Sequence, residues 1–242
     1  MLTNNKKVLL AIQNDEEDPP HLAGMWLAEM GIEIKVLKAF AGEPVPTSVP
    51  EGVDALMPLG GHMNALDDVT APWLANERLM LADAVKKDIP IFAICLGAQL
   101  LAAANGGTVS RQEHNEIGVY NIELLPAAAN DPVMNFESGA IAALWHEDYV
   151  SKLPEGATTI ASSELCQNQI YKMGSATYAV QFHPEADAGL VALWEAHNDN
   201  AFQSFKESGK TTVAPEMTES EAELIRTWKP ILQNWGKLIL AK

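Results

Sequence analysis

The sequence predicts an α/β protein in which helices pack on a mostly parallel central sheet that carries added antiparallel hairpin strands. Up to residue 105, apolar strand-like runs alternate with helical segments, an order typical of parallel sheets. After residue 107, shorter strand-like runs separated by turn residues predict the hairpins. We expect residues 1–242 to form a single domain, with residues 187–242 as a helical extension packed on it.

The first half of the chain predicts strands and helices in turn. Residues 8–12 form a continuous apolar run, which predicts a strand buried on both faces. Ile32, Ile34 and Val36 alternate with polar residues and predict a half-buried strand, while Gly31 ends the helix before it. We place further strands at residues 53–57 and 91–94, and helices at residues 21–30, 78–85 and 96–105.

The second half predicts hairpin strands followed by helices. The expected strands span residues 119–124, 159–161, 169–173 and 178–182. From Asp187 onward the pattern is helical, with a polar loop near residues 208–210. A final helix should begin behind residues 218–221, a helix-start signal, and Pro230 should kink or interrupt it. Its apolar side chains share one face, which favours core packing over a partner groove: Leu224, Ile225, Trp228, Ile231, Leu232, Trp235, Leu238 and Ile239.

Composition and charge exclude several classes of protein. Hydrophobic residues make up 48% and charged residues 20%, which argues against disorder. The formal net charge of -16 argues against unaided binding to nucleic acid or to an anionic membrane. The N-terminal apolar run is too short for a signal core and no span could cross a bilayer, so we expect a cytoplasmic protein. The acidic loop of residues 15–18 is interpreted as a solvated surface feature.

Cys95 is the candidate nucleophile. It stands between an apolar strand-like run and an alanine-rich helical segment, with Ala93 and Gly97 two positions to either side. Small residues there let strand and helix cross closely, as a nucleophile elbow requires, and a helix N-terminus favours the thiolate. A lone cysteine is usually only a small buried residue, and we assign that inert role to Cys166. Both thiols are expected to be reduced.

His183 and Glu185 complete a candidate catalytic constellation. They follow an apolar strand, so His183 would project at the same sheet edge as Cys95 if the two strands are neighbours. Pro184 constrains the turn between them, which leaves Glu185 able to accept the second imidazole N–H. Without Glu185 two residues on, His183 would be interpreted as a core histidine. The other histidines lack a shared metal-ligand spacing, so we expect no metal and no cofactor.

Three motifs together resemble the class I (triad) glutamine amidotransferases, most closely the stand-alone amidotransferase domain of GMP synthase. They are the segment from Cys95 to Gln99, the segment from His183 to Glu185, and the Gly60-Gly61 loop, in the same order along the chain. The resemblance covers residues 8–185. It implies a flavodoxin-like three-layer sandwich and hydrolysis of the glutamine side-chain amide through a glutamyl thioester.

The resemblance also implies a role for each matching residue. Cys95 would attack the amide carbon while the backbone N–H groups of Leu96 and Gly61 hold the oxyanion. His183 would protonate the departing ammonia and then activate water, with Glu185 stabilising the imidazolium. Residues implied to contact the substrate are Gly60, Gln99 and His146.

Two positions depart from the family pattern and keep a second function open. His62 follows the glycines where the family usually has proline, and Glu147 replaces a small residue beside the expected pocket. The added charge would disfavour the α-carboxylate of glutamine or select a substrate with an extra cationic group. The alternative is therefore a stand-alone γ-glutamyl hydrolase or peptidase with the same triad. In the amidotransferase version, ammonia would pass to a synthetase on another chain, because no phosphate-binding loop is present here.

Overall fold

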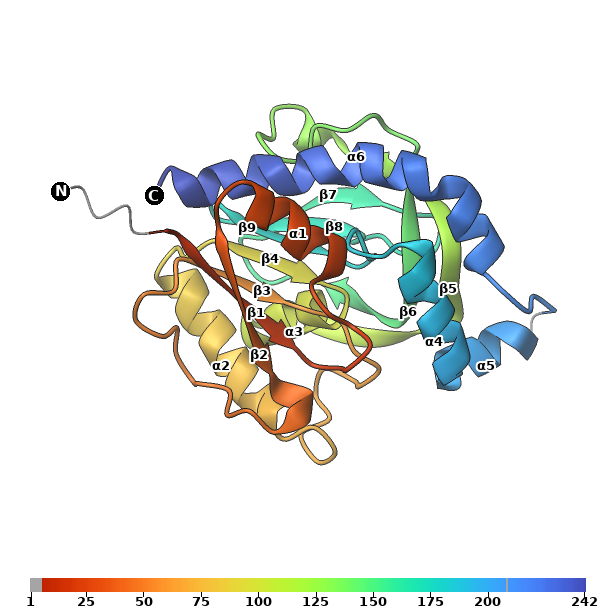
Figure 1. Ribbon diagram of the computed structural model, residues 1–242, viewed down its shortest axis with the longest axis horizontal. Coiled ribbons are helices and arrows are strands. Elements are labelled where there is room, and N and C mark those ends of the chain that lie inside the picture. The colour runs from red at the N-terminus through yellow and green to blue at the C-terminus, as the bar shows by residue number, and fades with distance from the viewer. Residues whose placement is uncertain (1–5, 208) are drawn as a thin grey trace.

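The computed structural model describes residues 6–207 and 209–242, so residues 1–5 and Ser208, in the predicted polar loop, lie outside it. One mixed sheet of nine strands runs through the molecule in the order β2-β1-β3-β4-β9-β8-β7-β5-β6 (Figure 1). The strands are β1 (Val8–Gln13), β2 (Glu33–Lys38), β3 (Ala55–Pro58), β4 (Ile91–Ile94), β5 (Thr108–Leu124), β6 (Ala140–Lys152), β7 (Thr158–Ser162), β8 (Ile170–Met173) and β9 (Thr177–Val180). The helices are α1 (His21–Glu29), α2 (Trp73–Lys86), α3 (Leu96–Ala104), α4 (Ala188–His197), α5 (Asn200–Glu207) and α6 (Ala214–Leu240), with short 3-10 turns η1 (Ala39–Ala41) and η2 (Pro126–Ala128).

The sheet is parallel in one half and antiparallel in the other. Strands β2, β1, β3, β4 and β9 are parallel neighbours. From β9 through β8, β7 and β5 to β6 every pairing is antiparallel. The expectation of a mostly parallel sheet is therefore wrong, because antiparallel pairings of the second half are as many as the parallel ones, which include the pairing of β4 with β9.

The predicted strands of the parallel half are confirmed, and their burial explains their apolar sequences. In β1, Leu9 and Ala11 belong to a hydrophobic cluster with α1 and α6, whereas Leu10 and Ile12 belong to a second cluster with α2 and α3. Side chains of a strand alternate between faces, so helices cover both faces of this sheet (Figure 1). β2 lies at the sheet edge, where Val36 is 37% exposed.

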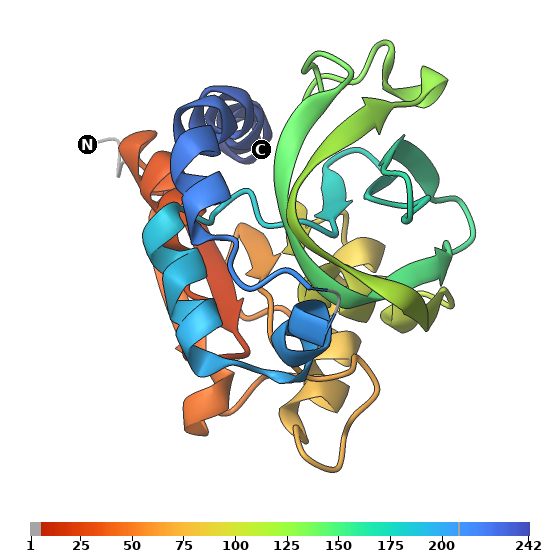
Figure 2. The same ribbon diagram turned by 90° about the vertical axis from the view of Figure 1, so that its right-hand side faces the viewer.

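Strands β5 and β6 are longer than the sequence indicated. We expected only residues 119–124 of β5 to be extended, yet the strand has 17 residues, and β6, with 13, was not predicted. The two strands pair along most of their length and curve together around one end of the molecule (Figure 2). The start of β5 is rich in polar residues and the start of β6 is rich in alanine, so both have weak β-propensity. Their pairing with each other outweighs this local preference.

The final helix forms without a break. α6 begins at Ala214, four residues before the expected start signal, and continues through Pro230 to Leu240. The alternative that Pro230 interrupts the helix is wrong, because Trp228 and Ile231 on either side are each only 1% exposed and their burial offsets the lost backbone hydrogen bond. Burial of Trp228 and Trp235 also confirms that the apolar stripe belongs to the core. Among the described residues, no helix is long and apolar enough to cross a membrane.

Candidate active site

Cys95 stands in the sharp turn between β4 and α3. Its backbone has φ 50° and ψ −108°, a positive-φ conformation that residues other than glycine rarely adopt. The turn depends on Gly97, because a Cβ atom there would lie 2.2 Å from the backbone oxygen of Pro58. The helix thus crosses the end of β3 at a distance that only glycine allows. This geometry matches the elbow expected from the small residues around Cys95.

Two backbone N–H groups beside Cys95 are available to an incoming oxygen. Leu96 is the first residue of α3, where N–H groups have no partner within the helix. Among the described residues, no hydrogen bond from the N–H of Leu96 or Gly61 is found. A Cβ atom on Gly61 would lie 3.0 Å from the Leu96 side chain, so the glycine loop and the helix start are in close contact.

His183 and Glu185 form a buried ion pair behind the cysteine. β9 lies next to β4, and three residues after β9 the Nδ1 atom of His183 donates a hydrogen bond to Oε1 of Glu185 over 2.7 Å. The two side chains are 3% and 1% exposed. Burial opposes a charged imidazole, but the charges of Glu185 and Cys95 and the hydrogen bonds to both outweigh it, and the pKa of His183 is held well above its usual value.

Gln99 and a residue that sequence reasoning missed, Gln181, connect the cysteine to the opposite wall. The Gln181 side-chain amide donates to Sγ of Cys95 over 3.6 Å. Gln99 donates to the oxygen of Gln181 over 3.4 Å and to the backbone oxygen of Asp148 over 2.9 Å. The position of Gln181, two residues before His183 at the end of an apolar strand, is the signal that would have identified it.

His146 and Gly60 occupy supporting positions. His146 is 4% exposed and lines the cavity described below, but both its ring nitrogens have protein partners. Nδ1 lies 3.2 Å from the backbone oxygen of Asp148, and Nε2 lies 3.1 Å from Oε2 of Glu116. Gly60 packs beside His183, where a Cβ atom would lie 3.0 Å from the imidazole Cε1. A larger residue at position 60 would therefore displace the histidine.

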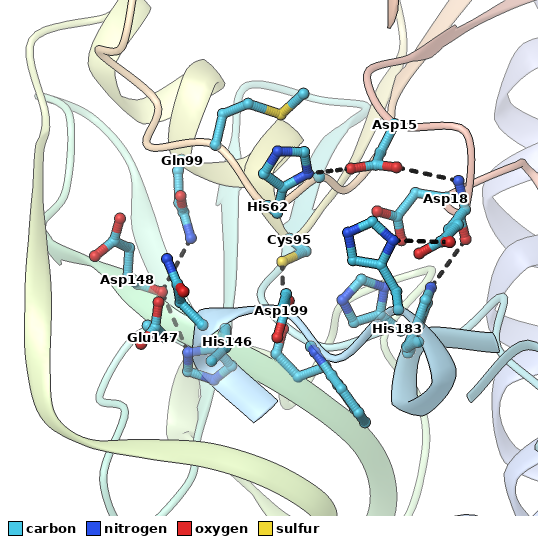
Figure 3. Close-up of a pocket in the computed structure, with 18 of the residues that line it drawn as sticks. Asp15, Asp18, His62, Cys95, Gln99, His146, Glu147, Asp148, His183 and Asp199 are labelled. Carbon is cyan, nitrogen blue, oxygen red and sulfur yellow. Dashed lines mark hydrogen bonds and ion pairs between the residues drawn. The ribbon is translucent and has the colours of Figure 1, made fainter. Parts of the chain in front are cut away.

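A cavity of about 410 Å³ opens above Cys95. In Figure 3 the cysteine lies between Gln99, Glu147 and Asp148 on one side and Asp15, Asp18 and His183 on the other. The linker between α4 and α5 and the start of α5 also line it, so the C-terminal helices contribute to the site. Sequence reasoning missed several lining residues: Asp15, Glu17, Asp18, Arg111, Trp194, His197 and Asp199.

The acidic loop before α1 belongs to this cavity and is not simply a solvated surface. Asp15, Glu17 and Asp18 line the cavity, and Asp18 is only 8% exposed. Trp194 of α4 holds the loop in place by donating its indole N–H to the backbone oxygen of Glu17 over 2.9 Å. Burial raises the pKa of Asp18 to about 7, although the nearby His183 charge lowers it.

The two departures from the family pattern have charged partners. His62 pairs with Asp15, and this hydrogen bond raises the pKa of His62 although burial lowers it. Glu147 pairs with Arg111 over 2.9 Å, and the same guanidinium contacts Asp148 over 2.7 Å. The charge of Glu147 is therefore offset by a cation from β5, which the spacing along the sequence does not reveal.

One group of described residues has the spacing of a metal site. Asp18, His183 and Glu185 each offer a ligand atom within 4.8 Å of the others. The hydrogen bond between His183 and Glu185 already accounts for two of the three groups. Of the three groups, only the Asp18 carboxylate therefore lacks a hydrogen-bond partner among the described residues. Cys166 is buried and unpaired, and burial raises the pKa of its thiol to about 12, consistent with an inert residue.

Comparisons with known proteins agree with this arrangement. The family model "Glutamine amidotransferase class-I" matches residues 26–191. One subunit of the glutamine-hydrolyzing GMP synthase of Thermococcus kodakarensis is 30% identical over 201 residues, which are 82% of this chain and 97% of the relative. The crystal structure of a glutamine amidotransferase from Thermotoga maritima superposes with a TM-score of 0.83 at 26% identity, covering 98% of this chain and 99% of that one. A second, from Methylobacillus flagellatus, has a TM-score of 0.82 at 27% identity, covering 96% and 95%. The chain therefore belongs to the class I glutamine amidotransferase family.

Proposed function

We propose that this protein hydrolyses the side-chain amide of glutamine, or of a related γ-glutamyl compound, through a thioester on Cys95. The observation that carries the proposal is the placement of Cys95, in a strained turn at a helix N-terminus, beside the buried His183–Glu185 pair. This combination supplies a nucleophile, a proton carrier and a group that orients the carrier. The oxyanion position is supported by the open N–H groups of Leu96 and Gly61.

The first half of the reaction forms the thioester. The Cys95 thiolate attacks the amide carbon, and the oxygen becomes an oxyanion that accepts hydrogen bonds from Leu96 and Gly61. The C–N bond then breaks as protonated His183 donates its proton to the leaving nitrogen. Glu185 stabilises the imidazolium before this transfer and keeps the ring in one orientation. Ammonia or an amine leaves, and the glutamyl group remains on sulfur.

The second half returns the enzyme to its starting state. His183, now neutral, accepts a proton from a water molecule that attacks the thioester carbon. The C–S bond breaks, glutamate is released and the Cys95 thiolate pairs again with the His183 imidazolium. We assign Gln99, Gly60 and His146 to the wall that holds the glutamyl part, where Arg111 offers a cation to its α-carboxylate.

The fate of the nitrogen distinguishes two versions of this function. Relatives of this chain are subunits of GMP synthase, and we propose by analogy a synthetase partner that receives ammonia. The second candidate is a stand-alone γ-glutamyl hydrolase. It is favoured by a second hollow of about 370 Å³ that shares Asp15, Glu17, His62, Met63 and His197 with the main cavity, since ammonia alone does not need this space.

Thioester chemistry is tested with 6-diazo-5-oxo-norleucine, a glutamine-derived electrophile. Intact-protein mass spectrometry should show one adduct, and peptide mapping should place it on Cys95. Cys95→Ser should lose both labelling and glutamine hydrolysis. The matched control Cys166→Ser should keep both. Normal turnover by Cys95→Ser would overturn the proposal. Glutamine hydrolysis that appears only with an added synthetase would favour the amidotransferase version over the hydrolase.

A further inference from the structure

The cavity above Cys95 is strongly acidic. Among the described residues, one arginine, Arg111, faces six carboxylates there: Asp15, Glu17, Asp18, Glu147, Asp148 and Asp199. Arg111 is bonded to the two carboxylates on the Gln99 side. The remaining four therefore have only histidines as counter-charges. His62 pairs with Asp15, and His197 pairs with Glu17 over 3.0 Å.

Asp18 stands out because none of the described residues forms a hydrogen bond with its carboxylate, although the charge of His183 acts on it. It is 8% exposed, it lines the cavity, and no hydrogen bond or ion pair of its side chain is found among residues 6–207 and 209–242. Burial therefore raises the pKa of Asp18 to about 7, and a cationic ligand beside the carboxylate would stabilise its charged form. A positive charge is the ligand that it would accept.

Asp15 and Asp18 lie where the leaving group of the substrate would be expected. His183 gives its proton to the leaving nitrogen, so the leaving group departs toward His183 and away from Gln99 and Arg111. Asp15 and Asp18 lie on the His183 side of Cys95 (Figure 3). The carboxyl carbon of Asp18 would lie 3.2 Å from a Cβ atom on Gly60, the glycine that packs against the His183 ring.

Space continues beyond this side. The second hollow of about 370 Å³ shares Asp15 and Glu17 with the main cavity and adds the aromatic side chains of Phe40 and Trp73. A leaving group of several carbon atoms would run from the scissile bond past Asp18 toward this hollow. Its methylene groups would contact apolar rings, and a terminal cation would remain within reach of the carboxylates.

We propose that the preferred substrate is a γ-glutamyl amide whose leaving amine carries a second, positively charged nitrogen, as in a γ-glutamylated diamine. This inference rests on the thioester chemistry proposed above and deepens it by assigning the leaving group. The reaction stays the same: water and the amide yield glutamate and the free diamine. The Asp15–Asp18 loop selects the leaving group, while Arg111 and Gln99 face the glutamyl part.

Three substrates that differ only at the end of the leaving group test the proposal. They are the γ-glutamyl amides of 1,4-diaminobutane, pentylamine and 4-aminobutanoate, with a cationic, a neutral and an anionic end. We expect kcat/KM for the cationic amide to exceed that for the neutral amide at least tenfold, and the anionic amide to be the poorest. Added salt should reduce the preference, since part of it is electrostatic.

Variants connect the preference to the named carboxylates. Asp18→Asn and Glu17→Gln should each lower the cationic-to-neutral ratio of kcat/KM at least threefold. The matched control Glu51→Gln changes an exposed carboxylate that lines neither hollow and should keep the ratio. Calorimetry of 1,4-diaminobutane with the Cys95→Ser protein should detect binding that Asp18→Asn weakens, a readout independent of turnover.

The outcomes separate the two proposals. Equal hydrolysis of all three amides, with Cys95 still labelled by the electrophile, would overturn the cationic leaving group and leave the thioester chemistry standing. A preference for the neutral or anionic amide would do the same. Failure of every amide and of glutamine, together with no labelling of Cys95, would overturn both.

Discussion

His183 Nδ1 lies 2.7 Å from Oε1 of Glu185, and the second carboxylate oxygen, Oε2, is buried with no hydrogen-bond partner among the described residues. The carboxylate therefore directs its bonding to the imidazole. This local contact, together with packing against Gly60 and Trp194, orients the His183 ring relative to Cys95.

Removing that interaction should impair proton transfer. Glu185→Gln takes away the charge that raises the pKa of His183, so that pKa should fall toward its usual value and the cysteine should lose its charged partner. We expect kcat/KM for glutamine to fall by roughly a hundredfold or more. Steady-state kinetics measure the loss, with Glu164→Gln as the control. Unchanged kcat/KM in Glu185→Gln would show that the carboxylate has no part in the reaction.

Gly97→Ala should destabilise the fold. Its Cβ atom would lie 2.2 Å from the Pro58 oxygen, a distance that only a shift of α3 or β3 relieves. Overpacking against backbone costs roughly 1–3 kcal/mol or more. Thermal unfolding followed by circular dichroism measures this. Gly189→Ala in α4 serves as the control, because its Cβ atom would meet only the Asp187 carboxylate oxygen, at 3.3 Å. Equal unfolding temperatures for the two variants would contradict the close crossing.

The two cysteines should differ in reactivity. Cys95 lines the cavity, whereas Cys166 is fully buried and its thiol pKa is raised to about 12 by burial and by the charge of Glu116. At pH 7.5 the native protein should be alkylated by iodoacetamide at Cys95 alone. Peptide mapping after partial reaction measures the ratio of the two sites. Modification of Cys166 at a similar rate would disagree with its burial.

Glu77 should make stability depend on pH. It is fully buried beneath the glycine loop, where Asn14 donates to it over 3.4 Å, and burial raises its pKa from 4.5 to about 8. The folded state therefore prefers the neutral form, and the free energy of unfolding should decrease as pH rises from about 4.5 toward about 8.

Glu77→Gln removes this titration. The variant should be more stable than the wild type at pH 8, by roughly 1–3 kcal/mol, and the difference should shrink at pH 5. Urea unfolding at the two pH values gives the comparison. A variant that is less stable than the wild type at pH 8 would mean that the ionised carboxylate is accommodated.

Local patterns predicted the parallel half of the fold. Strands β1, β3 and β4 are buried on both faces, and such strands appear in a sequence as continuous apolar runs. β6 was missed because its alanine-rich start carries little β-propensity of its own, and its conformation depends on pairing with β5. The pairing that makes β6 a strand therefore depends on two segments that are distant in the sequence.

The candidate site divides in the same way. The sequence alone could indicate Cys95, Gly97, His183 and Glu185, because the pattern that marks each of them lies within a few neighbouring positions. The place of the acidic loop could not be predicted, since its contacts join distant segments: Trp194 of α4 donates to the backbone of Glu17, and Asp18 lies beside Gly60. The compensation of Glu147 by Arg111 likewise joins two strands.

The candidate residues and most of the elements that carry them could thus be predicted from the sequence, because backbone conformation and strand burial leave short-range patterns. The size and charge of the cavity above Cys95 became visible in the folded structure alone. Burial and charge pairing arise from packing between segments far apart in the chain, and these two properties set how far a carboxylate such as Asp18 is solvated and whether it has a counter-charge.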